Sequence, residues 1–135
     1  MSTLKRAIEI AARTHADQFD PNGEPHILHP LRVMLNFKAP DDRIVAVLHD
    51  VVEKNDDWSI ERLRLEGFGS EVLDAVEALT RGPGEDFRDY VKRAGRNRIG
   101  RVVKRADIGD HLKNFPMGEH GAKYPEALLL LRSCE

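Results

Sequence analysis

The sequence is poor in cysteine and in long apolar runs. Its 135 residues include one cysteine, Cys134, which excludes an intrachain disulfide and a cluster of thiolate metal ligands. The aliphatic run at 127–131 is far shorter than the roughly 20 residues that a membrane-spanning helix needs. The first residues also lack the apolar stretch of a signal peptide. We therefore expect a cytoplasmic protein without a membrane partner, and a single thiol suits that reducing compartment.

An excess of charge of one sign is also absent, because the formal net charge is −2. Nothing in the overall composition therefore favours a nucleic-acid partner. Residues 81–105 are an exception, with nine basic residues against three acidic ones. Two interpretations stay open for this segment: a solvated face of two helices, or cations that meet an anionic, phosphate-bearing ligand. DNA binding is disfavoured because neither interleaved aromatic residues nor a recognised motif accompanies the charges.

Apolar residues recur at helical spacing along most of the chain, which predicts an all-α fold. We expect a helical bundle of about seven to eight helices, with Thr3, Ser59 and Ser70 as N-caps. The helix that begins at Pro40 and includes residues 49–55 is apolar almost all round, so it should be the central buried helix. The length fits one domain, 1–135. The expected helices cover residues 3–18, 30–38, 40–55, 59–66, 71–80, 87–96, 99–114 and the segment from 124 or 125 onward.

An adjacent His49-Asp50 pair interrupts the apolar surface of the central helix. An imidazole and a carboxylate are costly in such surroundings unless they are paired or bound to a metal. Helical spacing would place Glu53 over the same quadrant as both, where it could contact a metal-activated water. Taken alone, the pair is better explained by a His–Asp hydrogen bond near a helix end.

Two further segments supply metal-ligating side chains. Residues 24–30 contain His26 and His29, and residues 102–114 carry Asp107, Asp110 and His111 at helical spacing. The order is a histidine, then His-Asp about twenty residues later, then an aspartate about sixty further on. A mixed set of nitrogen and oxygen ligands suits Mn²⁺, Fe²⁺ or Zn²⁺ better than Ca²⁺. A local Asp107–His111 pair is the alternative for the last segment.

This order resembles that of the HD superfamily of metal-dependent phosphohydrolases. Over about residues 5–115, HADQFDPNGEPHILHPLRV, VAVLHDVVEKND, LEGFGSEVLDAVEALTR and VVKRADIGDHLKN are similar to segments of the RelA/SpoT-type hydrolases. The closest likeness is to stand-alone alarmone hydrolases, which remove pyrophosphate from the ribose 3′ position of (p)ppGpp. The resemblance implies a divalent metal, Mn²⁺ foremost and Fe²⁺ or Zn²⁺ otherwise, with Glu53 and Asp50 as catalytic residues. The implied metal ligands are His29, His49, Asp50 and Asp107.

Four positions depart from the family pattern. Phe19 replaces a basic residue that helps to hold the guanine nucleotide, and Lys54 replaces an acidic residue after Glu53. His26 stands for a tyrosine and His111 for an asparagine. Drift within a tolerant family is one explanation, and a different nucleotide substrate or weakened activity is the other.

Six residues are expected to contact a phosphorylated nucleotide. For Lys104 and His15 the alternatives are a solvated lysine and a packed histidine. Two rivals to the alarmone hydrolase stay open: a nucleotidase or phosphodiesterase of the same superfamily, and a nucleotide-binding module with little turnover. The last helix packs either on the core or on a second subunit, so a homodimer is also open. The expected substrate-binding residues are Lys104, Arg81, Lys54, His15, Gln18 and His26.

Overall fold

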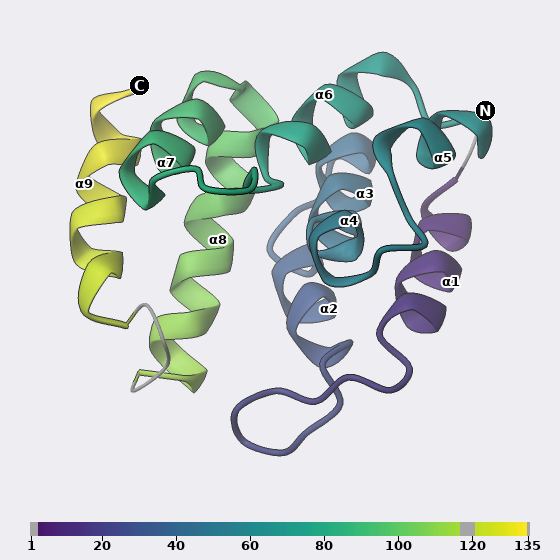
Figure 1. Ribbon diagram of the computed structural model, residues 1–135, viewed down its shortest axis with the longest axis horizontal. Coiled ribbons are helices and arrows are strands. Elements are labelled where there is room, and N and C mark those ends of the chain that lie inside the picture. Colours follow the sequence, from purple (N-terminus) through teal and green to yellow (C-terminus); the bar gives the residue numbers. More distant parts are fainter. Residues whose placement is uncertain (1–2, 117–120, 135) are drawn as a thin grey trace.

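The computed structural model describes residues 3–116 and 121–134, and these residues form helices joined by short loops (Figure 1). The predicted all-α fold is confirmed, and none of the described helices is long and apolar enough to cross a membrane. The α-helices are α1 Leu4–Thr14, α2 Leu28–Met34, α3 Pro40–Leu48, α4 Val51–Lys54, α5 Ile60–Leu65, α6 Ser70–Ala78, α7 Phe87–Arg96, α8 Arg98–Asn114 and α9 Tyr124–Ser133, with a 3₁₀ turn, η1, over Gly121–Lys123.

Side-chain caps set the start of several helices. Thr3 Oγ1 accepts a hydrogen bond from the Arg6 amide in α1, and Ser59 Oγ accepts one from the Arg62 amide in α5, as predicted. The predicted cap at Ser70 is wrong, because Ser70 is the first residue of α6 and Gly69 holds the cap position. The first helix also ends at Thr14, four residues earlier than expected, where the chain turns toward the loop over residues 19–25.

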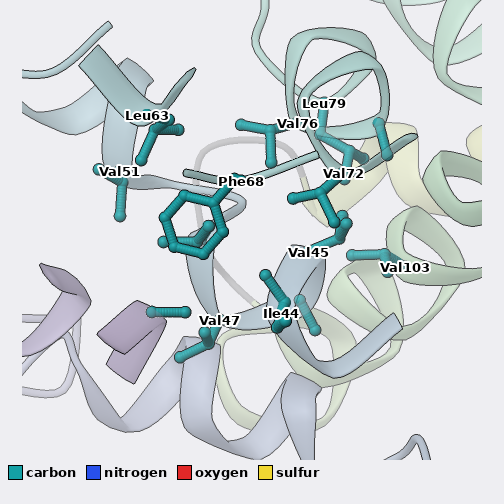
Figure 2. Packing of buried hydrophobic residues seen from close by; sticks show 14 of the residues in the cluster. Ile44, Val45, Val47, Val51, Leu63, Phe68, Val72, Val76, Leu79 and Val103 are labelled. Atoms are coloured by element: carbon teal, nitrogen blue, oxygen red, sulfur yellow. The ribbon is translucent and has the colours of Figure 1, made fainter. Parts of the chain in front are cut away.

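α3 is the central buried helix, as its apolar sequence predicts. Its residues Ile44–Leu48 are all buried, and it packs against α1, α2, α6 and α8. Figure 2 shows Val45 of α3 among the aliphatic side chains of α6 and Val103 of α8, with Phe68 beside them. We call this group, which draws mainly on α1, α3 and α6, the aliphatic cluster.

A second, smaller cluster joins α7, α8 and α9 on the other side of the molecule (Figure 1). We call it the aromatic cluster because three of its seven buried members are aromatic. The last helix therefore packs on the chain's own core, one of the two predicted alternatives, while a homodimer stays a prediction. The buried members are Phe87, Tyr90, Val91, Ile108, Tyr124, Ala127 and Leu131.

Candidate metal centre and cleft

Four side chains from three distant segments converge at one buried point. His29 comes from α2, His49 and Asp50 from the turn after α3, and Asp107 from the middle of α8. His29 Nε2 lies 2.9 Å from Asp107 Oδ1 and 3.8 Å from Asp50 Oδ2. His49 Nε2 lies 3.4 Å and 3.5 Å from the same two oxygens. The convergence expected of a metal site is therefore present.

The turn that carries His49 and Asp50 differs from the continuous helix expected over residues 40–55. α3 ends at Leu48, and α4 begins only at Val51. Asp50 holds the cap position of α4 but makes no side-chain cap bond, because its carboxylate faces the histidines instead. The break in the helix thus turns the carboxylate toward the other candidate ligands.

The spacing of the donor atoms suits a small divalent cation. Ligand atoms bound to one ion at about 2.1 Å lie about 3.0 to 3.4 Å apart when they are adjacent. The four separations between histidine nitrogens and carboxylate oxygens run from 2.9 to 3.8 Å. Two imidazoles and two carboxylates also form a donor set typical of Mn²⁺, Fe²⁺ or Zn²⁺.

Hydrogen bonds on the far side of each ring aim both histidines inward. His49 Nδ1 lies 2.6 Å from the Ala46 carbonyl oxygen, so Nδ1 carries the proton and Nε2 presents a lone pair. His29 Nδ1 lies 2.6 Å from Asp110 Oδ2, and the Arg32 guanidinium donates hydrogen bonds of 2.7 and 3.0 Å to the Asp110 carboxylate. Such outer partners fix the tautomer and orientation of metal-binding imidazoles.

The electrostatics of the cluster call for positive charge. Burial alone lowers the pKa of His29, but its hydrogen bonds to Asp107 and Asp110 outweigh burial and raise that pKa to about 10. Burial opposes ionisation of Asp50, yet the nearby His49 and His26 hold its pKa well below the usual value. Meanwhile His49 Nε2 is buried with no hydrogen-bond partner and faces two carboxylate oxygens. A cation at this point would bind the His49 nitrogen and both carboxylate oxygens, so the residues fit a metal.

His29, Asp50 and Asp107 line a cleft of about 590 Å³, and His49 is buried beside them. Glu53 lines this cleft, and its Oε1 accepts a hydrogen bond from the Arg81 amide at 3.2 Å. The exposed Lys54 and the backbone-anchored Arg81, whose Nε donates to the Glu85 carbonyl at 2.8 Å, also line it. The structure thus brings a carboxylate and two cations to the opening above the candidate metal centre.

Lys104 is buried, so the solvated-lysine alternative is wrong. Its Nζ donates to Asp107 Oδ2 at 2.8 Å and to the Tyr90 hydroxyl at 3.2 Å, and it lines the cleft. Burial disfavours the ammonium, but the adjacent Asp107 keeps the pKa of Lys104 well above its ordinary value. Of the nine basic residues at 81–105, Lys104 and Arg81 line the cleft, whereas Arg88 and Arg93 pair with glutamates outside it.

Three other expected substrate contacts occupy different places. His26 lines the cleft, and its Nε2 lies 3.1 Å from Asp50 Oδ2. His15 is buried behind it and bonds Gln18 Oε1 through Nδ1 at 2.7 Å, while Gln18 Nε2 donates to the Lys54 carbonyl at 2.9 Å. Neither His15 nor Gln18 is among the residues that line the cleft. Their observed contacts join the end of α1 to the end of α4.

Several residues of the site were not assigned from the sequence. Asp110 was seen only as part of a cluster, although its place three residues after Asp107 puts it on the same helical face. His111 lies with its Nε2 3.3 Å from Asp107 Oδ1, so the alternative of a local pair is also observed. Tyr90 and Tyr124 line the cleft from α7 and α9. No local signal marks these two tyrosines, because tertiary packing alone brings their helices to the cleft.

Part of the chain is similar to known proteins. The chain is 34% identical over 87 residues to a guanosine-3′,5′-bis(diphosphate) 3′-pyrophosphohydrolase from Borreliella burgdorferi, and 37% identical over 82 residues to one from Aquifex aeolicus. Each match covers 58% of this chain and 12% of the relative. A GTP pyrophosphokinase from Myxococcus xanthus is 34% identical over 85 residues, 60% of this chain and 11% of that protein.

The chain thus spans about an eighth of the length of these curated relatives. No family model matches it. The matched relatives include both hydrolases and a pyrophosphokinase, so their names do not by themselves fix an activity. The resemblance predicted from the four motifs is nevertheless confirmed: over more than half of its length, the chain is a relative of the guanosine-3′,5′-bis(diphosphate) 3′-pyrophosphohydrolases.

Proposed function

We propose that the protein is a metal-dependent phosphohydrolase that releases pyrophosphate from the ribose 3′ position of a nucleotide such as guanosine 3′,5′-bis(diphosphate). One observation carries the proposal: His29, His49, Asp50 and Asp107 converge, with separations of 2.9 to 3.8 Å between imidazole nitrogens and carboxylate oxygens, at the base of a cleft. Similarity to the 3′-pyrophosphohydrolases supports the choice of bond.

The metal is proposed to be Mn²⁺, with Fe²⁺ or Zn²⁺ as the alternatives, held by the four converging side chains. When bound, such an ion supplies Lewis acidity and activates water as a nucleophile at neutral pH. Asp110, which accepts hydrogen bonds from Arg32, would orient His29 toward the ion through His29 Nδ1. The Ala46 carbonyl would orient His49 in the same way.

Glu53 is proposed to orient the attacking water and to accept its proton. Its carboxylate lies at the cleft, and the Arg81 amide restrains one of its oxygens. The water oxygen attacks the phosphorus next to the ribose, the bond from phosphorus to the 3′ oxygen breaks, and that oxygen takes up a proton. Phosphoryl transfer depends mainly on positioning and on neutralising charge.

Three cations around the cleft are proposed to supply that neutralisation. Lys104 is held at the base by Asp107 and Tyr90, and Arg81 and Lys54 lie at the wall. Lys54 follows Glu53 directly, where related hydrolases carry an acidic residue. A lysine there would attract a phosphate that a carboxylate would repel.

The test is release of pyrophosphate from guanosine 3′,5′-bis(diphosphate) by the Mn²⁺-loaded protein. We expect turnover in the wild-type protein and a loss of at least about a thousandfold in Asp50→Ala, because the variant loses a group that positions the metal. The matched control is Asp74→Ala, which removes an exposed carboxylate of α6 that does not line the cleft. This control should retain wild-type activity.

The same assay should include nucleoside 5′-phosphates, cyclic nucleotides and simple phosphate esters. One contrary result is that the protein releases orthophosphate or opens a cyclic ester while it releases no pyrophosphate from the 3′-substituted nucleotide. That result would show that its substrate is another phosphorylated metabolite. Nucleotide binding without any product, by protein that holds its metal, would reduce the function to that of a binding module.

A further inference from the structure

We infer that His111 is a fifth protein ligand, so that the proposed ion is held by three imidazoles and two carboxylates. The inference rests on the proposed metal-dependent function and extends its ligand set. His111 lies on α8 one turn after Asp107, and its Nε2 is 3.3 Å from Asp107 Oδ1. His29, Asp107 and His111 each offer one ligand atom, and these atoms all lie within 4.8 Å of one another. His29, His49 and Asp50 form a second such group, so His29 is common to both.

The position of His111 on its helix is that of a chelating partner. Residues four apart on an α-helix face the same side, which is why two histidines at this spacing can bind one zinc ion in other proteins. Here the pair is Asp107 and His111, and its open side faces His29, whose ring centre is 4.7 Å from that of His111. The helix therefore presents an oxygen and a nitrogen together to the centre of the cluster.

The crowding around one oxygen is the second argument. Asp107 Oδ1 has three imidazole nitrogens near it: His29 Nε2 at 2.9 Å, His111 Nε2 at 3.3 Å and His49 Nε2 at 3.4 Å. A carboxylate oxygen offers about two lone-pair positions to hydrogen-bond donors. His29 and His111 can fill those two positions, and His49 Nε2, which presents a lone pair, faces the same oxygen without a hydrogen bond. A cation shared by the oxygen and the nitrogens would remove the repulsion between this lone pair and the carboxylate.

The neighbours of His111 keep its ring at the cluster. Phe115 lies with its ring centre 5.5 Å away and Tyr124 with its ring centre 5.4 Å away. His111 is nevertheless partly exposed and lines the cleft, so a ligand at this point stands between the metal and the substrate space. A third imidazole should also shift the preference of the site from Mg²⁺ toward metals that favour nitrogen.

The test counts imidazoles on the bound metal. Protein stripped with a chelator would be reloaded with Mn²⁺, and the Mn²⁺ X-ray absorption spectrum and titration affinity would be measured for wild type and His111→Asn. We expect three imidazoles per ion in the wild type and two in the variant, with affinity at least about tenfold weaker. Asparagine is polar and smaller than histidine, and the position is partly exposed, so the substitution should be tolerated.

Two controls separate the possible outcomes. Lys113→Ala removes an exposed side chain of the same helix that does not line the cleft and should leave both measurements unchanged, whereas Asp50→Ala should abolish tight binding. Two imidazoles in the wild type, or unchanged affinity in His111→Asn, would overturn the role of His111 while the metal centre stands. Two bound ions per chain would also overturn this role, because His111 would then belong to a second, neighbouring site. If the wild-type protein bound no metal, just as Asp50→Ala is expected to bind none tightly, the proposed function itself would be ruled out.

Discussion

The aliphatic and aromatic clusters differ in what their surfaces face. In α3, Val45, Ala46, Val47 and Leu48 are completely buried, with helices on every side. In the aromatic cluster, Phe87, Tyr90 and Tyr124 pack together on one side and line the cleft on the other. The aliphatic cluster can therefore serve stability alone, while the aromatic cluster combines packing with the wall of a site.

α8 joins the two clusters and carries the charges where they meet. Val103 belongs to the aliphatic cluster and Ile108 to the aromatic cluster. Between them lie the buried Lys104 and Asp107. Figure 1 shows α8 running between the helices of the two sides. The buried charges of α8 thus lie at the boundary, where a cleft gives them access to a ligand.

The largest stability effect is expected from Asp107→Ala at this boundary. The substitution leaves the buried Lys104 ammonium with the Tyr90 hydroxyl as its remaining hydrogen-bond partner among the described residues. Removing one member of a buried ion pair typically costs about 3 to 5 kcal/mol. Urea unfolding of metal-free protein should show a loss of that size, and adding Lys104→Met should restore much of it. A loss below about 1 kcal/mol would mean that the boundary is more hydrated than its burial implies.

A pair of leucine substitutions compares the clusters directly. Leu48→Ala in α3 and Leu131→Ala in α9 each remove a completely buried side chain. The cost depends on how far the surroundings relax, within about 2 to 5 kcal/mol. We expect about 4 kcal/mol for Leu48, which is enclosed by several helices, and about 2.5 kcal/mol for Leu131 in the terminal helix. Thermal and urea unfolding would measure both, and equal costs would abolish the distinction between the clusters.

The sequence predicts the aliphatic side of this comparison better than the aromatic side. Apolar residues at five consecutive positions, 44–48, predict that α3 has no solvated face and is the central helix. All five are buried in the structure. The three ligand segments were also recognisable, since imidazoles and carboxylates are conspicuous among apolar residues. By contrast, the break after Leu48 was missed, because the apolar pattern continues through Val51 and Val52.

Residues that depend on tertiary packing escaped prediction. Asp110 acquires its role only when α8 lies beside α2, where Arg32 and His29 reach it. Tyr90 and Tyr124 come from helices that are adjacent in space but not identifiable as neighbours from their local sequence. Lys104 was placed on a solvated surface in one interpretation, because a lysine is almost never fully buried unless it is paired.

Two buried histidines, His15 after α1 and His29 in the candidate metal centre, should give opposite pH dependences in metal-free protein. Burial lowers the pKa of His15 to about 4, below the unfolded value of 6.5. The unfolded chain therefore binds the proton first as the pH falls, and stability is lost from pH 6.5 down to about 4. The shift corresponds to about 3 kcal/mol. The pKa of His29 is raised to about 10, so its contribution is full below pH 6.5 and is lost as the pH rises through about 10.

Unfolding free energies measured between pH 4 and pH 10 would check both signs. His15→Asn keeps a donor near the Nδ1 position for Gln18 but cannot titrate, so it should flatten the acid limb and leave the alkaline limb intact. Saturating Mn²⁺ should instead flatten the alkaline limb, because a bound imidazole is neutral. An unchanged acid limb in His15→Asn would show that other groups produce it.

The smallest effects are expected from two arginines that tie helices together at the surface. Arg93 pairs with Glu85 at 2.9 Å and also donates to the carbonyls of Glu77 and Thr80, which links α7 to the end of α6. Arg6 pairs with Glu66 alone. We expect Arg93→Met to cost about 1 to 2 kcal/mol, since backbone carbonyls lose a donor, and Arg6→Met to cost less than about 1 kcal/mol. High salt should reduce the cost at Arg6 more than at Arg93, because neutral carbonyl acceptors are insensitive to screening. Equal costs with equal salt dependence would mean that Arg93 acts as an ordinary surface ion pair and that its bonds to the Glu77 and Thr80 carbonyls add no stability.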